Sequence, residues 1–267
     1  MSFHLHEKDG LSWLTSDVLP ARHMFTRKLG GVGDFPYSAN PDPVWEAPPV
    51  QSRVAELWRR LREAGDFPAE GFCFTRQIHG TMIRTVGPEE RRMPPLSPRP
   101  EDCDGLATTE KDTPLCVFTA DCVPVLLCDP VAGAAAAVHS GWKGTAADMM
   151  GAAVERLTAL GARPENIFAA IGPAIDRCCF ETGPEVKAAV EALLGADAEG
   201  LCPPEEGVPG KYMVDLKETN RRALLRRGVR PEHIDVCPDC TKCMAEVYWS
   251  HRATAGRRGT QASIITL

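Results

Sequence analysis

Hydrophobic positions along the chain follow two periods, one typical of amphipathic helices and one typical of short buried strands. Leu57, Trp58 and Leu61 belong to a stripe with helical spacing, which predicts a helix over residues 51–64 that ends at Gly65. Similar stripes, together with a first-turn proline, a near capping box and glycine stop signals, predict three more helices. These lie over residues 143–160, 184–195 and 215–228.

Short apolar runs between polar and glycine-rich stretches predict strands. The predicted strands cover residues 71–75, 115–119, 123–128, 134–139, 167–171, 234–237 and 263–267. This mixture of helices and strands indicates an α/β or α+β fold. Two stretches rich in glycine and proline, residues 30–50 and 87–100, are predicted to be long loops.

A weak internal similarity connects two parts of the chain. GARPENI at residues 161–167 and GVRPEHI at residues 228–234 each follow a predicted helix and precede a predicted strand. The pattern is that of a glycine stop followed by a proline turn. It indicates either two duplicated helix–strand units or two similar helix exits.

Length and composition narrow the class of protein. The chain has 267 residues, which fits one large domain or two small ones. The net charge of -6 and the aromatic content of 6% argue against nucleic-acid binding. No apolar run is long enough for a membrane span, and the N-terminus lacks the pattern of a secretory signal. We therefore expect a cytoplasmic protein whose eleven cysteines are reduced thiols, metal ligands or catalytic groups.

Three potential metal ligands lie where predicted strands end, namely His79, Cys122 and His139. Two imidazoles and a thiolate suit Zn²⁺, and three protein ligands leave a fourth position open, which is typical of catalytic zinc. Their separations form no local motif, so two hydrogen-bonded histidines and a small buried cysteine are the alternative interpretation. Asp121, next to Cys122, is expected to orient a ligand, to act as a base or to cap a turn.

The turn after His139 contains Gly141 and Gly144 and leads into a predicted helix. Glycines let backbone N–H groups approach a ligand at a positive helix terminus, and Lys143 adds positive charge. This turn is therefore a candidate anion or phosphate site, although it lacks the glycine spacing of known phosphate loops.

A competing metal site has the spacing Cys237-x-x-Cys240-x-x-Cys243, with Cys178 and Cys179 elsewhere in the chain. Thiolates at such spacing are typical of structural zinc or of an iron–sulfur cluster. The fourth cysteine of a ferredoxin-like run is absent from this stretch.

Seven segments spread over residues 25–267 form a longer pattern. They are FTRKLGGVGDFPY, QIHGT, DGLATT, TADCVPVLLCDP, AAVHSGWKGT, IGPAIDRCCFE and CTKCMAEVYWSHRATAGRRGTQASIITL. In this order and spacing they resemble the multicopper polyphenol oxidase or laccase-domain family, also described as zinc-dependent purine nucleoside phosphorylases. TADC followed by HSGWKG is the most specific part of the resemblance.

The resemblance implies one domain over residues 1–267, of the α+β class, with mixed β-sheets and flanking helices layered α/β/β/α. It implies zinc, or alternatively copper, bound by His79, Cys122 and His139, which would also be the catalytic groups. The implied reaction is phosphorolysis of adenosine, inosine, guanosine or methylthioadenosine, with adenosine deamination as a second activity. The implied partners are a purine nucleoside and phosphate, without nucleic acid or membrane, in a monomer or homodimer.

The resemblance also implies substrate-binding residues. The basic candidates for phosphate binding are Arg27, Arg53, His251 and Arg252, beside Lys143 of the glycine turn. The polar candidates for ribose or base are Asn40, Gln77, Asp104 and Glu181. The alternative for each basic residue is a surface ion pair, and for each polar residue a turn cap or a buried hydrogen bond.

The chain departs from the family pattern in two regions. It reads SANPDPVWEAPP at residues 38–49 instead of a Leu-Asn-Leu stretch, and ATAGRRGTQAS at residues 253–263 without the usual second arginine beside the first. Of the three C-terminal cysteines only Cys240 matches a regular family position, so Cys237 and Cys243 are expected to be free thiols.

Three other functions use the same features. Cys122 and His139 suit a metal-free cysteine hydrolase, as nucleophile and base. A copper-dependent phenol oxidase is a second alternative, but seven histidines are few for several histidine-rich copper sites. A non-catalytic interaction protein is the third, although a binding module has no need for an open metal position.

Overall fold

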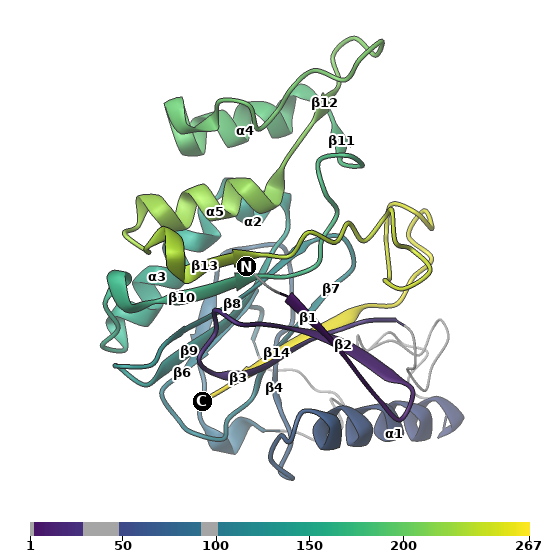
Figure 1. Ribbon diagram of the computed structural model, residues 1–267, viewed down its shortest axis with the longest axis vertical. Coiled ribbons are helices and arrows are strands. Elements are labelled where there is room, and N and C mark those ends of the chain that lie inside the picture. Colours follow the sequence, from purple (N-terminus) through teal and green to yellow (C-terminus); the bar gives the residue numbers. More distant parts are fainter. Residues whose placement is uncertain (1–2, 29–47, 92–100) are drawn as a thin grey trace.

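The apolar runs of the chain form two six-stranded sheets (Figure 1). The computed structural model describes residues 3–28, 48–91 and 101–267, without the side chains of residues 48–51, 53 and 54. The strands of the first sheet, in the order in which they lie side by side, are β1 (Phe3–Lys8), β2 (Leu11–Ser16), β3 (Arg22–Thr26), β14 (Gln261–Thr266), β7 (Leu115–Thr119) and β4 (Cys73–Phe74).

The second sheet carries most of the strands that were expected from apolar runs. In spatial order it contains β13 (Ile234–Val236), β10 (Phe168–Ile171), β8 (Val123–Asp129), β9 (Ala134–Ser140), β6 (Gly105–Thr108) and β5 (Ile83–Thr85). In the antiparallel pairing of β8 with β9, Pro124 lies opposite His139, and in that of β6 with β9, Gly105 lies opposite Val138. This register places Asp104, just before β6, next to His139.

Alternate side chains of the central strands fill two separate cores. In β8, Val125 and Leu127 face one side of the sheet, whereas Leu126 and Cys128 face the other. Because both faces are buried, the strand is a continuous apolar run rather than an alternating one. The core between the sheets includes Phe25, Leu115, Val117 and Ile265 of the first sheet and Leu106, Leu126, Ala135 and Ala170 of the second.

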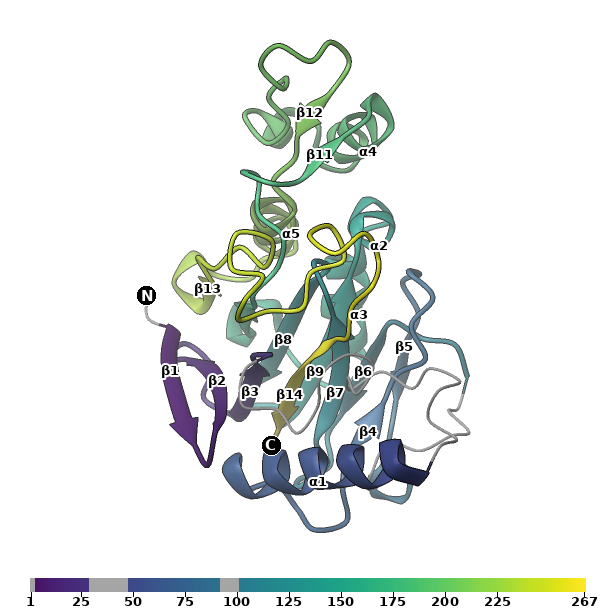
Figure 2. The same cartoon turned by 90° about the vertical axis from the view of Figure 1, so that its right-hand side faces the viewer.

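Helices cover the outer faces of both sheets. Trp58 of α1 (Pro48–Ala64) packs against Phe72, Phe74 and Phe118 on the first sheet. The other core contains residues of the second sheet and of α3 (Met149–Ala159), α4 (Pro184–Leu194) and α5 (Leu216–Arg226). In Figure 2, α1 lies at the lower end of the molecule and α4 at the upper end. The expected α+β class with α/β/β/α layers is confirmed.

Three of the four expected helices form with small changes at their ends. The helix expected over residues 51–64 begins earlier, at Pro48, since proline is tolerated in a first turn. The helices α4 and α5 match the expectation closely. At the start of α5, the Asp215 carboxylate accepts a hydrogen bond of 2.9 Å from the backbone N–H of Glu218, as its capping pattern predicted.

The helix expected over residues 143–160 is wrong as a single element. The chain forms α2 (Trp142–Ala146), and then α3 begins anew at Met149. Asp148 between them adopts a left-handed conformation with φ of 61°, and its side chain caps α3 by accepting from the N–H of Gly151. Aspartate tolerates this conformation because its short side chain bonds to the local backbone.

The internal similarity corresponds to two matching helix–strand units. After α3 comes the 3₁₀ helix η3 (Pro164–Asn166) and then β10; after α5 comes η5 (Pro231–His233) and then β13. The strands β10 and β13 pair in parallel, with Ala169 opposite Ile234. The repeated sequence therefore places two equivalent strand ends side by side.

Several elements were not expected from the sequence. They are β1, β2, β3, β5 and β6, the two-stranded ribbon of β11 (Glu181–Thr182) and β12 (Tyr212–Met213), and the 3₁₀ helices η2 (Pro88–Glu90) and η4 (Gly195–Ala198). The β1 strand is almost fully exposed, so it lacks the buried alternation that identifies a strand. Most of the two expected loops, residues 30–50 and 87–100, lies outside the described residues.

None of the helices in the described part of the chain has the length and apolar character needed to cross a membrane.

Replacing Trp58 by alanine tests how strongly α1 is attached to the first sheet. Trp58 is fully buried in edge-to-face contacts with three phenylalanines, so Trp58→Ala should lower the free energy of unfolding by about 3–5 kcal/mol. Urea unfolding followed by circular dichroism measures this loss. Trp58→Phe serves as the control and should lose less, and equal stabilities of Trp58→Ala and the wild type would contradict this packing.

Candidate metal centre

Three side chains from different strand ends converge on one point. His79 follows β4, Cys122 lies in the turn between β7 and β8, and His139 belongs to the last part of β9. One ligand atom from each lies within 4.8 Å of the others, and Cys122 Sγ is 3.9 Å from His79 Nε2. The imidazole rings meet edge to face with centroids 4.9 Å apart. His139 is buried, Cys122 is partly exposed and His79 is exposed, so the point is open to solvent on one side.

The carboxylate of Asp104 holds both histidines in place. Its Oδ1 accepts hydrogen bonds from the backbone N–H of His79 at 2.9 Å and from Nδ1 of His139 at 2.8 Å. Its Oδ2 accepts from the N–H groups of Ile78 at 3.1 Å and Gly80 at 2.7 Å. A carboxylate has about four lone-pair positions, and all of them are used here. Asp104 therefore orients the two candidate histidine ligands from the interior of the protein.

This hydrogen bonding fixes the geometry of the two imidazoles. His79 has a left-handed backbone with φ of 64°, an uncommon conformation for a non-glycine residue that the bonds to Asp104 stabilise. Because Nδ1 of His139 donates to Asp104, Nε2 is the nitrogen of this ring that could bind a metal ion, and the ring also interacts with Cys122. A carboxylate behind a ligating histidine is the arrangement that orients metal ligands in proteins.

The charges at the site favour a thiolate. Burial raises the pKa of Cys122, but its interactions with His139 and His79 lower it overall, well below the usual thiol range. Burial lowers the pKa of His139, but Cys122 and Asp104 raise it overall. One thiolate and two imidazole nitrogens form a donor set that fits Zn²⁺ with a fourth position open.

Gly141 leaves the space that a bound ion needs. A Cβ atom at this position would lie 2.9 Å from His79 Cδ2, 3.2 Å from Cys122 Sγ and 3.6 Å from His139 Cε1. The missing side chain therefore forms a cradle at the centre of the three candidate ligands. The backbone at Gly141 is extended, with φ of -68°, so space rather than conformation requires glycine here.

Asp121 connects the C-terminal segment to the site. It has φ of 83°, and its carboxylate accepts hydrogen bonds from Thr241 Oγ1 at 2.6 Å, Ser250 Oγ at 3.1 Å and the N–H of Arg252 at 2.7 Å. These bonds connect Asp121 to a distant segment of the chain, so they are not the local turn cap that was expected. Asp104 orients the ligating histidine instead.

Two polar residues expected to bind substrate take part in hydrogen bonds within the protein. The four hydrogen bonds to Asp104 leave it no position for a substrate, and the residue is 0% exposed. The amide of Gln77 accepts from the N–H of Phe118 at 2.8 Å and donates to the carbonyl of Phe118 at 2.6 Å. Both residues support the loop that carries His79.

The remaining expected substrate residues have mixed positions. The guanidinium of Arg252 lies 5.4 Å from the centre of the Phe180 ring and donates a hydrogen bond of 3.1 Å to the carbonyl of Glu181. Arg252 and Glu181, which were both expected to bind substrate, therefore lie next to each other. Lys143 and His251 are exposed. The helix that follows the glycine turn, α2, is too short to provide the expected helix-terminus anion site. Asn40 and the side chain of Arg53 lie outside the described residues.

Two half-buried arginines carry unused hydrogen-bonding capacity. The Nε atoms of Arg27 and Arg258 are buried, and neither has a hydrogen-bond partner among the described residues. Burial lowers the pKa of Arg258, and the negative charges of Cys122 and Asp121 act in the opposite direction. The sequence analysis did not select Arg258 as a candidate. The residue lies within residues 253–263, one of the two regions where the sequence departs from the family pattern.

Comparison with known proteins identifies the family. The sequence model of the family described as multi-copper polyphenol oxidoreductase laccase matches residues 22–267. The chain belongs to this family. Among its relatives, the purine nucleoside phosphorylase YlmD of Geobacillus stearothermophilus is 36% identical and covers 98% of this chain and 96% of its own length. A purine nucleoside phosphorylase of Deinococcus radiodurans is 34% identical over 97% of this chain and 94% of its own.

A solved structure of the same family has this fold. The crystal structure of YlmD from Geobacillus stearothermophilus superimposes with a TM-score of 0.86 at 32% sequence identity, over 99% of this chain and 98% of the other. The family expected from the sequence segments is thereby confirmed.

Replacing Gly141 by alanine tests whether the cradle holds an ion. The added Cβ would be too close to His79 and Cys122 and would move these ligands. Gly141→Ala should therefore weaken zinc binding by about 10–100-fold, the usual effect of losing ligand orientation. Competition with a chromogenic chelator measures this affinity. Gly80→Ala is the matched control, because its Cβ would meet Asp104 Oδ2 at an ordinary 3.5 Å. Equal zinc affinities of the two variants would contradict the proposed use of this space.

Proposed function

We propose that this protein is a zinc-dependent purine nucleoside phosphorylase. Its substrates are adenosine, inosine, guanosine and methylthioadenosine, which it cleaves with phosphate to the base and ribose 1-phosphate or its methylthio analogue. The observation that carries the proposal is the convergence of His79, Cys122 and His139 within 4.8 Å around the Gly141 cradle. The names of two relatives that match nearly the whole chain support the same reaction.

The donor set favours zinc over copper as the resident metal. Two imidazole nitrogens and one thiolate with an open position match catalytic zinc, and when bound the ion supplies Lewis acidity next to the substrate. The family description names several coppers. In the described residues, the one other group of potential ligands consists of four thiols, which lack the imidazoles that suit copper oxidase sites.

Phosphorolysis requires positive charge near the sugar. The bond between C1′ and the purine nitrogen breaks with its electron pair on the base, which takes up a proton, and a phosphate oxygen bonds to C1′. Arg258 is suited to hold this phosphate, because its buried Nε lacks a partner among the described residues. It also belongs to the segment that Asp121, next to Cys122, binds through Ser250 and the N–H of Arg252. Arg27 has an equally unpaired buried Nε, and Arg252 lies on the neighbouring loop.

The other predicted substrate contacts complete this proposal. Glu181, next to Arg252, and the exposed Lys143 and His251 are retained as residues at the edge of the nucleoside or phosphate site. Asn40 and Arg53 remain predictions from the family resemblance. Asp104, whose acceptor positions are all used, acts on the loop of His79. Gln77 also binds this region and remains a predicted substrate contact.

Adenosine deamination is proposed as a second activity of the same site. In this reaction water adds to C6 of adenine and ammonia leaves, and the three-ligand donor set with an open position is the arrangement that activates water in hydrolytic enzymes. His139, whose Nδ1 proton is held by Asp104, stays fixed as a ligand during this reaction.

A metal-free cysteine hydrolase is the main rival function. The lowered pKa of Cys122 and the raised pKa of His139 describe a thiolate–imidazolium pair, which is also typical of nucleophilic cysteines. The nearby imidazole of His79 and the cradle at Gly141 favour a metal instead. The family description favours a copper oxidase, but the described residues contain no second group of ligands that includes histidines.

We further propose that residues 1–267 act as one domain in the cytoplasm, as a monomer or homodimer that binds neither nucleic acid nor membranes. The acidic net charge and the cysteine content support these assignments.

Product analysis separates the rival functions. Zinc-loaded protein incubated with adenosine and phosphate should give adenine and ribose 1-phosphate, detected by chromatography, and chelation should abolish both. Cys122→Ala should lower turnover by more than about a hundredfold, the upper limit for changes that only disturb ligand orientation.

Cys202→Ala is the matched control, since Cys202 is buried outside the site, and it should keep its activity. Inosine as the sole product would support the deaminase alone. Full activity of the metal-free protein would contradict the zinc proposal and favour thiol chemistry.

A further inference from the structure

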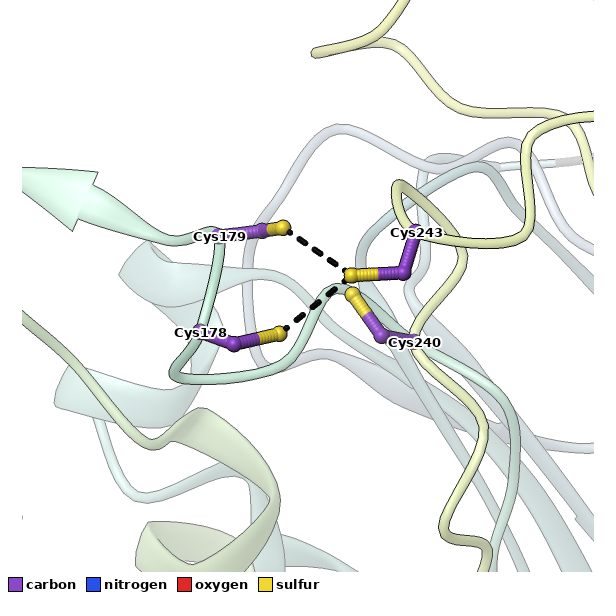
Figure 3. Close-up of side chains that lie close together, drawn as sticks. All are labelled: Cys178, Cys179, Cys240 and Cys243. Carbon is purple, nitrogen blue, oxygen red and sulfur yellow. Dashed lines mark hydrogen bonds between the residues drawn. The ribbon is translucent and has the colours of Figure 1, made fainter.

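Four cysteines form a second cluster that is separate from the candidate catalytic site. Cys243 Sγ lies 3.4 Å from Cys179 Sγ and 3.6 Å from Cys178 Sγ, and all four sulfur atoms, including that of Cys240, lie within 4.8 Å of one another (Figure 3). Cys243, which was expected to be a free thiol, forms no disulfide but lies within this group. Cys237 is buried and does not belong to the group, so the three-cysteine spacing is not the unit of the site.

We propose that Cys178, Cys179, Cys240 and Cys243 bind a second, structural zinc ion. In Figure 3 the side chains of the first two point toward those of the last two from opposite segments of the chain. Four thiolates around one ion form a closed tetrahedral site with no open position, which is typical of structural rather than catalytic zinc.

The sulfur separations favour a single ion over other uses of four cysteines. Tetrahedral thiolates at a Zn–S distance of ~2.3 Å are about 3.8 Å apart, close to the observed 3.4 and 3.6 Å. A disulfide requires ~2.05 Å between sulfur atoms and involves only two of the four. A cubane iron–sulfur cluster binds each cysteine to a different iron atom, which needs sulfur atoms farther apart than this group allows.

A backbone donor faces one sulfur atom of the cluster. The backbone N–H of Asp176 donates to Cys240 Sγ at 3.3 Å, which is the kind of outer bond that supports metal-bound sulfur. Four thiols lose four protons to solvent when zinc binds, so the centre carries a net charge of about -2. Two basic residues, Arg177 and Lys242, are adjacent in sequence to Cys178 and Cys243.

The zinc would join two loops whose strands already pair. Cys178 and Cys179 follow β10, whereas Cys240 and Cys243 follow β13, and beyond these strands Ala174 and Cys240 form an isolated parallel bridge. Between the last two ligands lies Thr241, whose hydroxyl donates to Asp121 next to Cys122. A metal here therefore fixes the segment that leads from β13 to the candidate phosphate residues Arg252 and Arg258.

Zinc content tests this site independently of catalysis. Full-length protein loaded with zinc and freed of excess metal by gel filtration should contain two zinc ions per chain by mass spectrometry. The double variant Cys178→Ser/Cys243→Ser should contain one zinc ion. Both substituted residues are exposed, so the variant should still fold. Cys122→Ala should also contain one, because it keeps the four-cysteine site, and Cys202→Ser should keep both.

Cobalt substitution identifies the ligands of the second ion. In the Cys122→Ala background, Co²⁺ should give strong thiolate-to-metal charge-transfer absorption, and the added Cys178→Ser/Cys243→Ser change should abolish it. One zinc per wild-type chain that is retained in the double variant would overturn the proposal. So would a disulfide between Cys243 and Cys178 or Cys179 in peptides of non-reduced protein, or iron with acid-labile sulfide. A protein with two zinc ions but no phosphorolysis would keep this proposal and remove only the proposed function.

Discussion

The carboxylate of Asp104 lies fully inside the protein and accepts four hydrogen bonds, three from consecutive backbone N–H groups at residues 78–80 and one from His139. Leaving these donors buried without an acceptor would cost about 1–3 kcal/mol for each group. The pairing of β6 with β9 brings Asp104 opposite His139, and the same carboxylate holds the loop of His79 in its left-handed conformation. One buried charge thus connects a strand and a loop that are far apart in sequence.

The third candidate ligand depends on the way the chain passes between the sheets. The strand β7 belongs to the first sheet and β8 to the second, so the short turn that contains Asp121 and Cys122 crosses from one to the other. In this turn, the carboxylate of Asp121 accepts hydrogen bonds from Thr241, Ser250 and the N–H of Arg252, all in the C-terminal segment. Both proposed metal centres are therefore linked to this segment. The one at Cys122 is linked through Asp121, and the four-cysteine one through Cys240 and Cys243 on either side of Thr241.

The spacing of apolar residues and the signals at element ends predicted those helices and strands that depend on neighbouring residues. The helices α4 and α5, the strand β7 and both central strands of the second sheet follow from apolar spacing and end signals. The three candidate ligands followed from their positions at strand ends. The hydrogen bonding of Asp104 could not be predicted from local patterns, because it arises from contacts between distant segments. The four-cysteine group was missed as a unit for the same reason, since the parallel pairing of β10 with β13 brings its two halves together.

The central claim is that Asp104 organises the catalytic metal centre from behind without contacting substrate. The zinc affinity of Asp104→Asn, measured by chelator competition, tests it most directly, because asparagine keeps the shape but replaces an accepting oxygen with a donating amide. The account predicts binding weakened by about 10–100-fold at this centre, with the four-cysteine zinc retained. An unchanged affinity in a folded Asp104→Asn protein would contradict it.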